Sequence, residues 1–536
     1  MTPQRPVRRS GCREVPTGAQ NVDCPPGRFG LGVVGKDEPM PVTPRRALAT
    51  LVTLALGLTL AACGEDAAGT RADPMSSGSG AGVPGPTGEP TRVTDRGDLS
   101  VARSETREDS VYPEVGDPLV DALHYALDLT WDPKQDRLSA KQKLTFRATT
   151  DAAQIPLALS DALEVSALTV DGEKAAFTGA DDRLTIDHPV TADQQYVVEL
   201  AYAGTPVPAD APSTRSDFRQ GLGWNITDDH ETWTMQEPYG AFTWYAVNDQ
   251  PADKALYDFT LTVPEPWSGV ANGVLTDTTT RKGMVTDVWH LAEPASSYLV
   301  TVAFGHYQRT DLKSASGVPV QVWAPADGEA LPGGTGTAPD AIDWLEKILG
   351  PYPFESFGIV VVDNESGMET QTMVTLGNTE YSLSPAVVVH EAAHHWYGDT
   401  VSPADWSDVW MNEGMAMYLQ GMWEAEQEGI SIDRKMDEWA GFEDDLRAGA
   451  GPPGDYDPQQ FGDGNIYYGP AVMWQELRKK IGDDRFFALL KDWPASRENR
   501  STDRADYLAW IEKETGEDLG AFFDAWLLDK QSPPRA

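Results

Sequence analysis

The hydrophobic pattern of this chain changes part-way along the sequence, from a period of two residues to a period near 3.6. Between about residues 117 and 310, short alternating runs are separated by turn residues, which is typical of antiparallel β-strands with one buried face. These runs are HYALDLTW, LSAKQKLTF, LEVSALTV, RLTIDHP, QYVVELAY, ALYDFTLTV and YLVTVAFG. From about residue 311 the spacing is helical, in IDWLEKIL, PAVVVHEAAHHW, NEGMAMYLQGMWEAE, PAVMWQELRKKI and DRFFALLKDW. We therefore expect a multidomain α+β protein, with an antiparallel β-sandwich or saddle-like sheet over 117–310 and a mainly helical domain over 311–536.

Composition narrows the class of protein further. Charged residues make up 23% of the chain and hydrophobic residues 40%, which is ordinary for a globular protein. Acidic residues outnumber basic ones 83 to 42, so a partner held by phosphate neutralisation, such as a nucleic acid, is not expected. Only three cysteines are present, which excludes a disulfide scaffold.

The N-terminal region carries an export signal. Two arginines precede an uncharged run that ends in Leu-Ala-Ala-Cys, so residues 40–62 are typical of a lipoprotein signal peptide and Cys63 of the acylated residue. The alternative is an ordinary secretion signal with an incidental cysteine. Residues 1–39 precede a complete signal and are interpreted as a mis-assigned start. Residues 63–116 are rich in Gly, Ser and Pro, which predicts a flexible tether. We expect an exported protein, held on the outer side of the cell membrane through lipid on Cys63.

One short motif has the spacing of a metal site. His390 and His394 are four residues apart in a predicted helix, so both imidazoles lie on one face, with Glu391 beside them. Glu413 follows nineteen residues after His394, at the start of another predicted helix. Two imidazoles and one carboxylate form a typical hydrolytic zinc site that keeps a position for water. The alternative is a pair of core histidines satisfied by hydrogen bonds.

The stretch HEAAHHWYGDTVSPADWSDVWMNEGMAMYLQ resembles the gluzincin metallopeptidases of the aminopeptidase N family, whose motif is HExxH, eighteen residues, then Glu. The resemblance extends from about Asp121 to Lys530. It implies a thermolysin-like catalytic domain with one zinc ion per chain, held by His390, His394 and Glu413, and Glu391 as the general base. His395 points about 100° away from the ligands and is expected to pack or to support them. We do not expect the large C-terminal helical domain that many relatives carry.

Further residues follow from the same resemblance. The family loop that binds the substrate's α-amine corresponds to Ser366–Thr370, which implies that Glu369 anchors the amine and that Met368 lines the substrate site. A second amine-binding glutamate corresponds to Glu237, twelve residues before Asp249, with Met235 affecting the pocket for the first side chain. Alone, either acid could be a solvated surface carboxylate.

The segment GNIYYGPAVMWQELRKKIG resembles the family segment that supplies a tyrosine over the metal. Tyr467 aligns with that tyrosine and Tyr468 is the rival. Its phenol would donate a hydrogen bond to the oxyanion that forms on the substrate. The resemblance implies a zinc aminopeptidase acting on peptides with a free N-terminus. The alternatives are a non-catalytic peptide-binding lipoprotein on the same fold and an epoxide hydrolase. The sequence leaves the oligomeric state open.

Overall fold

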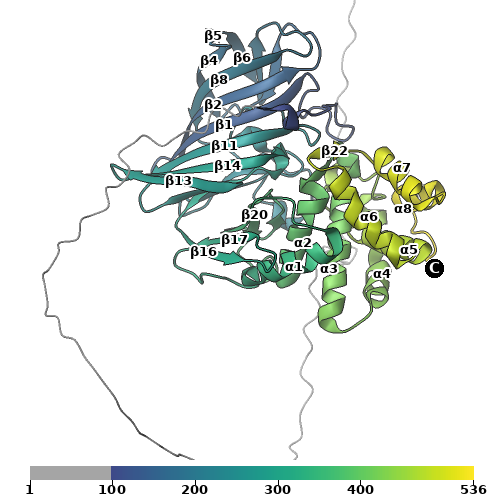
Figure 1. Cartoon of the computed structure of the whole chain (residues 1–536). Coiled ribbons are helices and arrows are strands. Elements are labelled where there is room, and N and C mark those ends of the chain that lie inside the picture. Colours follow the sequence, from purple (N-terminus) through teal and green to yellow (C-terminus); the bar gives the residue numbers. More distant parts are fainter. Residues whose placement is uncertain (1–97, 536) are drawn as a thin grey trace, which may run out of the picture. The chain divides into compact units, whose positions relative to one another are not determined.

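The strands of the N-terminal half form one large, almost entirely antiparallel sheet. The computed structural model describes residues 98–535, and Figure 1 shows the large sheet beside the helices. Its eight strands lie in the order β13-β14-β11-β1-β2-β8-β4-β5, and only β1 and β11 are parallel. The strands are β1 (Val120–Asp132), β2 (Arg137–Ala148), β4 (Leu163–Val170), β5 (Glu173–Lys174), β8 (Gln195–Gly204), β11 (Lys254–Pro264), β13 (Val274–Arg281) and β14 (Met284–Ser296).

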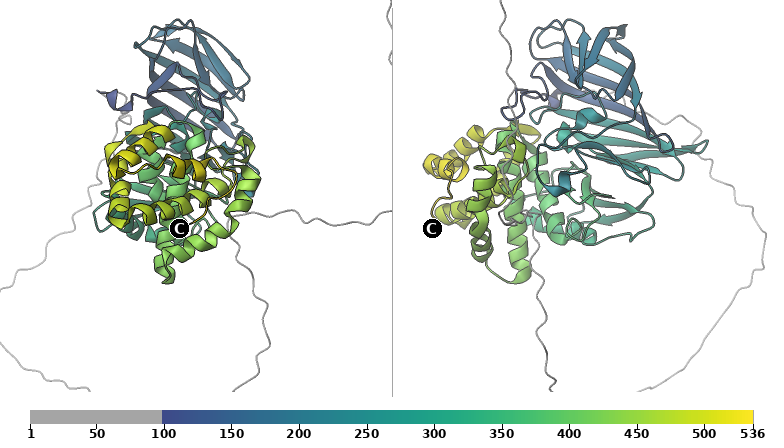
Figure 2. Two further views of the ribbon diagram at one scale, coloured as in Figure 1. Left: turned by 90° about the vertical axis from the view of Figure 1, so that its right-hand side faces the viewer. Right: turned by 180° about the vertical axis from the view of Figure 1, so that it is seen from behind.

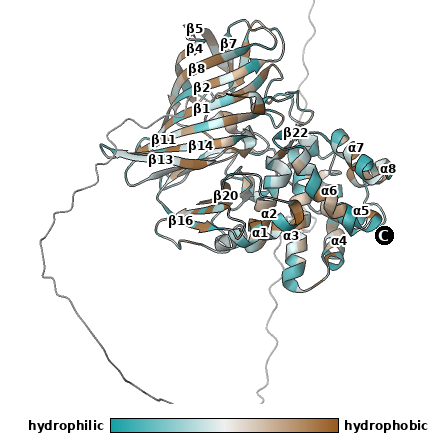
Figure 3. Ribbon diagram, viewed as in Figure 1, coloured by the Kyte–Doolittle hydropathy of each residue, from teal (hydrophilic) through white to brown (hydrophobic). Residues whose placement is uncertain are grey.

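The alternating pattern decides which face of this sheet is buried. Along β2, Leu138, Leu144 and Phe146 are fully buried while the residues between them are more exposed. Figure 3 shows apolar and polar residues alternating along these strands. The buried face packs against a second sheet, since Trp131 of β1 contacts Trp224 at a ring distance of 5.5 Å. This second sheet contains β9 (Gly223–Ile226), β10 (Thr232–Met235), β12 (Ser268–Ala271) and β15 (Val302–Gly305). A third, small sheet contains β3 (Ile155–Ala158), β6 (Ala176–Ala180) and β7 (Arg183–Asp187). The predicted layered β domain is confirmed.

The C-terminal half begins with a mixed sheet that the hydrophobic periodicity does not predict. Its order is β16-β17-β18-β20-β19, with strands β16 (Tyr307–Lys313), β17 (Pro319–Pro325), β18 (Phe357–Val362), β19 (Gly367–Met368) and β20 (Val374–Gly377). The sequence of β18, FGIVVV, is buried on both faces and therefore lacks the alternation that reveals a half-exposed strand. β16 also crosses the domain boundary predicted at residues 310 and 311.

Helices make up the rest of the chain. In both views of Figure 2 the blue strands of the large sheet lie above the green and yellow helices. The helices are α1 (Ala338–Leu349), α2 (Pro385–His394), α3 (Trp410–Glu428), α4 (Ile432–Ala450), α5 (Tyr468–Ile481), α6 (Asp483–Ser496), α7 (Arg504–Thr515) and α8 (Gly520–Leu527), with a short two-stranded sheet of β21 (Val401–Pro403) and β22 (Arg500–Thr502). All five predicted helical segments are helices, whereas α4, α7 and α8 are additional. No helix within residues 98–535 has the length and apolar character needed to cross a bilayer.

The predicted flexible tether is wrong in its last part. Residues 98–116 pack against the body of the protein, where Asp109 accepts a backbone hydrogen bond from Trp406 and Ser110 bonds the Asp405 carboxylate. Arg107 also forms an ion pair with Asp503 at 3.1 Å. Composition alone misses these contacts because each uses a polar side chain that has a specific partner far along the chain. The signal peptide, Cys63 and residues 63–97 of the tether lie outside the described residues.

Candidate metal centre and active-site pocket

Helices α2 and α3 bring the three predicted metal ligands together. α2 begins at Pro385 after Ser384, whose side chain caps the helix by accepting a hydrogen bond from a backbone N–H. The Nε2 atoms of His390 and His394 lie 3.1 Å apart. Glu413, in the first turn of α3, places Oε2 at 3.3 Å from His390 Nε2 and 3.4 Å from His394 Nε2. All three side chains are buried.

This triangle of donor atoms has the size of a zinc site. Zinc binds imidazole nitrogen and carboxylate oxygen at about 2.0–2.1 Å with tetrahedral geometry, which places its ligand atoms about 3.3–3.4 Å apart. The three separations of 3.1, 3.3 and 3.4 Å agree with that edge length. The residues present therefore fit one zinc ion bound by two imidazoles and one carboxylate.

The surroundings of His394 favour the tautomer that a metal requires. Its Nδ1 lies 3.1 Å from the backbone carbonyl oxygen of Tyr397, so Nδ1 donates to that carbonyl and Nε2 keeps its lone pair. Gly398 follows at φ 144°, and a Cβ there would lie 3.2 Å from His394 Nδ1. His395 points elsewhere, since its Nδ1 is 2.7 Å from the hydroxyl of Tyr352. His395 is thus a packing residue behind the site, as predicted.

The electrostatics of the three ligands suit a bound cation. Burial would raise the pKa of Glu413, but the neighbouring His394 and His390 side chains lower it to about 2. Burial likewise opposes the charge of His394, yet the Glu369 and Glu413 carboxylates raise its pKa well above the usual range. Burial lowers the pKa of His390. Glu413 is therefore ionised, as a metal ligand must be.

Glu391 lies against the edge strand β19. A Cβ added at Gly367 would meet Glu391 Oε1 at 2.4 Å, so the strand approaches the carboxylate closely only because residue 367 is glycine. Burial raises the pKa of Glu391 well above its ordinary value, and the nearby Glu369 and Glu413 carboxylates add to this effect. A carboxylate with a raised pKa beside the ligands is a stronger base than an exposed one and can accept a proton and return it.

Two further carboxylates reach the same place from different parts of the chain. Glu237 follows β10 of the N-terminal half and Glu369 follows β19, yet Glu237, Glu369 and Glu413 place carboxylate oxygens within 4.8 Å of one another. Glu237 Oε1 and Glu369 Oε1 are buried without a hydrogen-bond partner. Burial raises the pKa of both, to about 7 for Glu369. Buried carboxylate oxygens without a hydrogen-bond partner are energetically costly, which indicates that they bind a cationic group of a ligand.

The two adjacent tyrosines at the start of α5 have different surroundings. Tyr467 lines the pocket with Glu391 and Glu413, and its ring lies over that of His390 at a centroid distance of 6.1 Å. Burial and the Glu413 carboxylate raise the pKa of Tyr467 well above its ordinary value, so the phenol stays protonated and can donate. Tyr468 instead packs against Trp439 and Phe442 of α4.

The pocket also has lining residues that the sequence analysis misses. Met235 and Met368 line it, in agreement with their predicted positions, but so do Arg215 and Phe218 from the loop over 206–222. No periodicity or motif in that polar loop marks these two residues as part of a site. The pocket has a volume of about 30 Å³.

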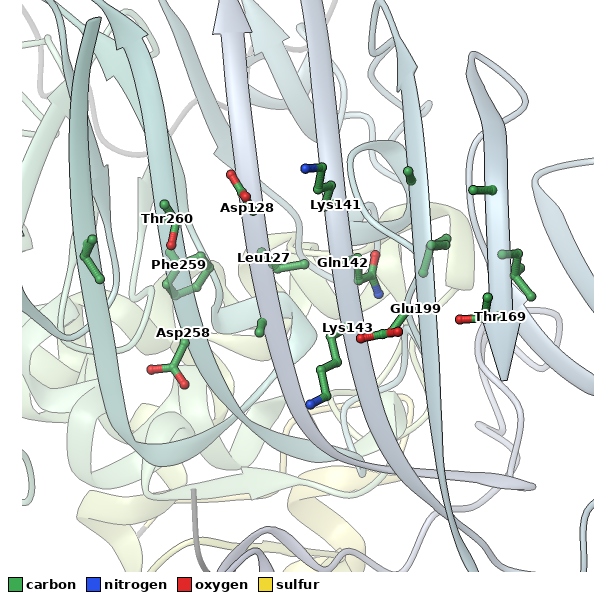
Figure 4. Close-up of a pocket in the computed structure, with 16 residues that line it drawn as sticks. Leu127, Asp128, Lys141, Gln142, Lys143, Thr169, Glu199, Asp258, Phe259 and Thr260 are labelled. Atoms are coloured by element: carbon green, nitrogen blue, oxygen red, sulfur yellow. The ribbon is translucent and has the colours of Figure 1, made fainter. Parts of the chain in front are cut away.

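A larger recess of about 420 Å³ lies on the outer face of the large sheet, and Figure 4 shows its side chains. Its charged groups pair across neighbouring strands: Lys141 lies opposite Asp128, and Lys143 lies opposite Glu199. Such pairs are the normal surface of an antiparallel sheet. The recess therefore has a structural explanation, and the chemistry of the molecule lies at the histidine and glutamate cluster.

Comparison with known protein families agrees with this geometry. The family model described as "Peptidase M1 N-terminal domain" matches residues 121–299, and the one described as "Peptidase family M1 domain" matches residues 336–526. The chain belongs to the M1 peptidase family. M1 peptidases of this gluzincin type hold zinc, and zinc is the cofactor of the site formed by His390, His394 and Glu413.

Individual relatives show the same likeness over part of their length. Aminopeptidase N of Streptomyces lividans is 26% identical over 335 residues, which cover 56% of this chain and 38% of the relative. Aminopeptidase B of Mus musculus is 32% identical over 182 residues, which cover 32% of this chain and 27% of the relative. The chain thus spans less than half the length of these relatives.

Among solved structures, an M1 zinc metallopeptidase from Deinococcus radiodurans has a TM-score of 0.72 at 26% identity. The match covers 80% of this chain and 98% of that chain. A point mutant of an M1 zinc metallopeptidase from the same organism, bound to a Tyr-Ser-Ala substrate, also has a TM-score of 0.72, at 25% identity. The two-domain arrangement of this chain is therefore that of M1 peptidases.

Proposed function

We propose that this M1 peptidase is a zinc-dependent aminopeptidase that removes residues from the free N-terminus of peptides. The observation that carries the proposal is that Glu237 and Glu369 each place a buried carboxylate oxygen without a hydrogen-bond partner beside the ligand triangle. A free α-ammonium group is the complement of this pair, because it can donate to both oxygens and neutralise their charge. An internal stretch of a peptide has no cation to offer at that position.

Each residue then has a defined task in peptide hydrolysis. Zinc, when bound, acts as a Lewis acid that lowers the pKa of water and polarises a carbonyl group. Glu237 and Glu369 hold the ammonium, which places the first peptide carbonyl over the ligands. Glu391 takes the proton from the attacking water and passes it to the departing amine. Tyr467 donates a hydrogen bond to the oxygen on which negative charge develops.

A comparison of capped and uncapped peptides tests the proposal. The purified protein should cleave an unblocked peptide at its first bond and leave the N-acetylated form of the same peptide intact. Equal hydrolysis of both would indicate an endopeptidase, and release of a diol from an epoxide substrate without peptide cleavage would favour an epoxide hydrolase.

A second experiment tests Glu391 as the general base. Glu391→Gln should keep one zinc per chain, measured by metal analysis, while turnover falls by orders of magnitude. Full activity in that variant would contradict the role of Glu391. Zinc binding without cleavage in the wild type would instead support the non-catalytic peptide-binding alternative.

We also propose that the protein is exported and anchored to the cell membrane through lipid on Cys63. The apolar run of residues 47–62, the preceding arginines and the final Leu-Ala-Ala-Cys support this proposal. Metabolic labelling with palmitate should mark the protein and co-purify it with membranes, and Cys63→Ser should remove the label. A secreted, unlabelled wild type would show that residues 40–62 are an ordinary secretion signal.

A further inference from the structure

One arginine of the β domain reaches into the pocket of the catalytic domain. Arg215 belongs to the loop over 206–222, which connects β8 to β9, and it lines the same pocket as Glu369, Glu391 and Tyr467. Its side chain is only 13% exposed. A guanidinium group at this position needs an explanation, because the proposed substrate brings its own positive charge to the pocket.

The hydrogen bonds of Arg215 fix the orientation of its side chain. Nε and Nη2 donate to the two carboxylate oxygens of Asp217, which neutralise the charge in a bidentate pair. Nη1 donates to the backbone carbonyl oxygen of Gly462 at 2.8 Å and to the hydroxyl oxygen of Tyr467 at 3.2 Å. The guanidinium also lies over the rings of Phe218 and Tyr467. These contacts use four of the five N–H donors of Arg215 and hold its side chain on several sides.

The contact with Tyr467 decides where the phenolic hydrogen points. A guanidinium group has five N–H donors and no acceptor, so the oxygen of Tyr467 must be the acceptor of this hydrogen bond. The hydrogen of the phenol then points away from Arg215. Tyr467 lines the pocket together with Glu391 and Glu413, so an acceptor bound in the pocket can receive that hydrogen bond.

We propose that Arg215 is a positioning residue for Tyr467: it occupies the acceptor side of the phenol oxygen and thereby leaves the O–H free to donate to the oxyanion of the reaction. The inference rests on the proposed peptidase function. It means that a loop of the β domain completes the catalytic site.

Substitution of Arg215 tests this role. The loss of a hydrogen bond to a charged group corresponds to a change of roughly 10- to 150-fold in an equilibrium or rate constant. Arg215→Met should therefore lower kcat by a factor in this range and change KM by less than about twofold. Arg215→Lys keeps a donor and should recover part of the loss. Arg309→Met is the matched control, since Arg309 also pairs with an aspartate two residues later and lies over an aromatic ring, that of Trp323, outside the pocket.

The same substitution in a Tyr467→Phe variant distinguishes a positioning role of Arg215 from a purely structural one. In Tyr467→Phe the hydroxyl is already missing, so adding Arg215→Met should change kcat by less than about twofold. An equal loss in both backgrounds would overturn the inference, as would a rise in KM with unchanged kcat. Unchanged kinetics of Arg215→Met in an active enzyme would also overturn it.

Binding gives a readout that does not depend on turnover. A phosphinic pseudodipeptide imitates the tetrahedral state, whereas a primary alkylamine, which has no carboxylate to reach the metal or Tyr467, tests only the ammonium site. Arg215→Met should weaken the first at least about tenfold and leave the second unchanged. Equal weakening of both would overturn the inference. A zinc-loaded wild type that cleaves no peptide would instead overturn the proposed function, and with it the task assigned to Arg215.

Discussion

The paired carboxylates of Glu237 and Glu369 allow a quantitative prediction about the recognition of a free N-terminus. Their oxygens lie within 4.8 Å of each other. A charge-assisted N–H···O bond spans about 2.7–2.9 Å and the N–H bonds of an ammonium group diverge by about 109°, so one nitrogen bridges two oxygens that lie about 4.4–4.7 Å apart, which agrees with this limit. A single ammonium group therefore reaches both carboxylates without any movement of the protein.

The magnitude follows from replacing one charged acceptor with a neutral one. Glu237→Gln and Glu369→Gln keep the shape of each side chain but remove its charge. A hydrogen bond to a charged group contributes about 1.5–3 kcal/mol, which corresponds to roughly 10- to 150-fold in kcat/KM for an unblocked peptide. The two single losses should not add, because both carboxylates bind the same nitrogen.

The assay compares kcat/KM on unblocked peptides for each variant with that of Glu365→Gln. Glu365 is an exposed glutamate four residues before Glu369, so it controls for the loss of one negative charge near the loop. A change of less than about threefold in both Glu237→Gln and Glu369→Gln would refute the ammonium clamp, and so would parallel losses in Glu365→Gln.

Three other perturbations have clear expected outcomes. Tyr467→Phe should lower kcat roughly 100- to 1000-fold in peptide assays, whereas Tyr468→Phe should stay within a few-fold of the wild type; the reverse order would identify Tyr468 as the oxyanion donor. Gly367→Ala places a Cβ at 2.4 Å from Glu391 Oε1, so kcat should fall at least about tenfold while metal analysis still finds zinc; an unimpaired variant would show that the strand can shift at no cost. Burial raises the pKa of Asp408 from 3.8 to about 6, so the folded state binds more protons than the unfolded state between these values and stability falls as pH rises through them. Asp408→Asn should remove this component. Its unfolding free energy relative to the wild type should therefore rise by about 2.4 kcal/mol from pH 4 to pH 7 in denaturant titrations, and parallel curves would contradict the shift.

Local patterns in the sequence were sufficient for many of the elements and, together with the family motif, for the ligand set. The alternation in residues 138–146 and the helical spacing of residues 385–396 are each decided within a few residues, because side-chain direction repeats with a fixed period in strands and helices. That same periodicity places His390 and His394 on one face of a helix. The strand FGIVVV at residues 357–362 was not recognisable in this way, since a strand buried on both faces has no alternation.

Only the tertiary structure decided how distant parts of the chain complete the pocket. Whether Tyr467 or Tyr468 faces the ligands depends on the path of the loop that leads into α5. The sequence alone does not decide between two adjacent tyrosines in such a loop. The sequence does not identify Arg215 as a site residue, because its loop has no hydrophobic periodicity. Its role depends on a hydrogen bond to a residue 252 positions away in the sequence. Periodic patterns in a sequence follow from the side-chain directions of a single helix or strand. The contacts between two domains depend instead on packing between segments that share no local pattern.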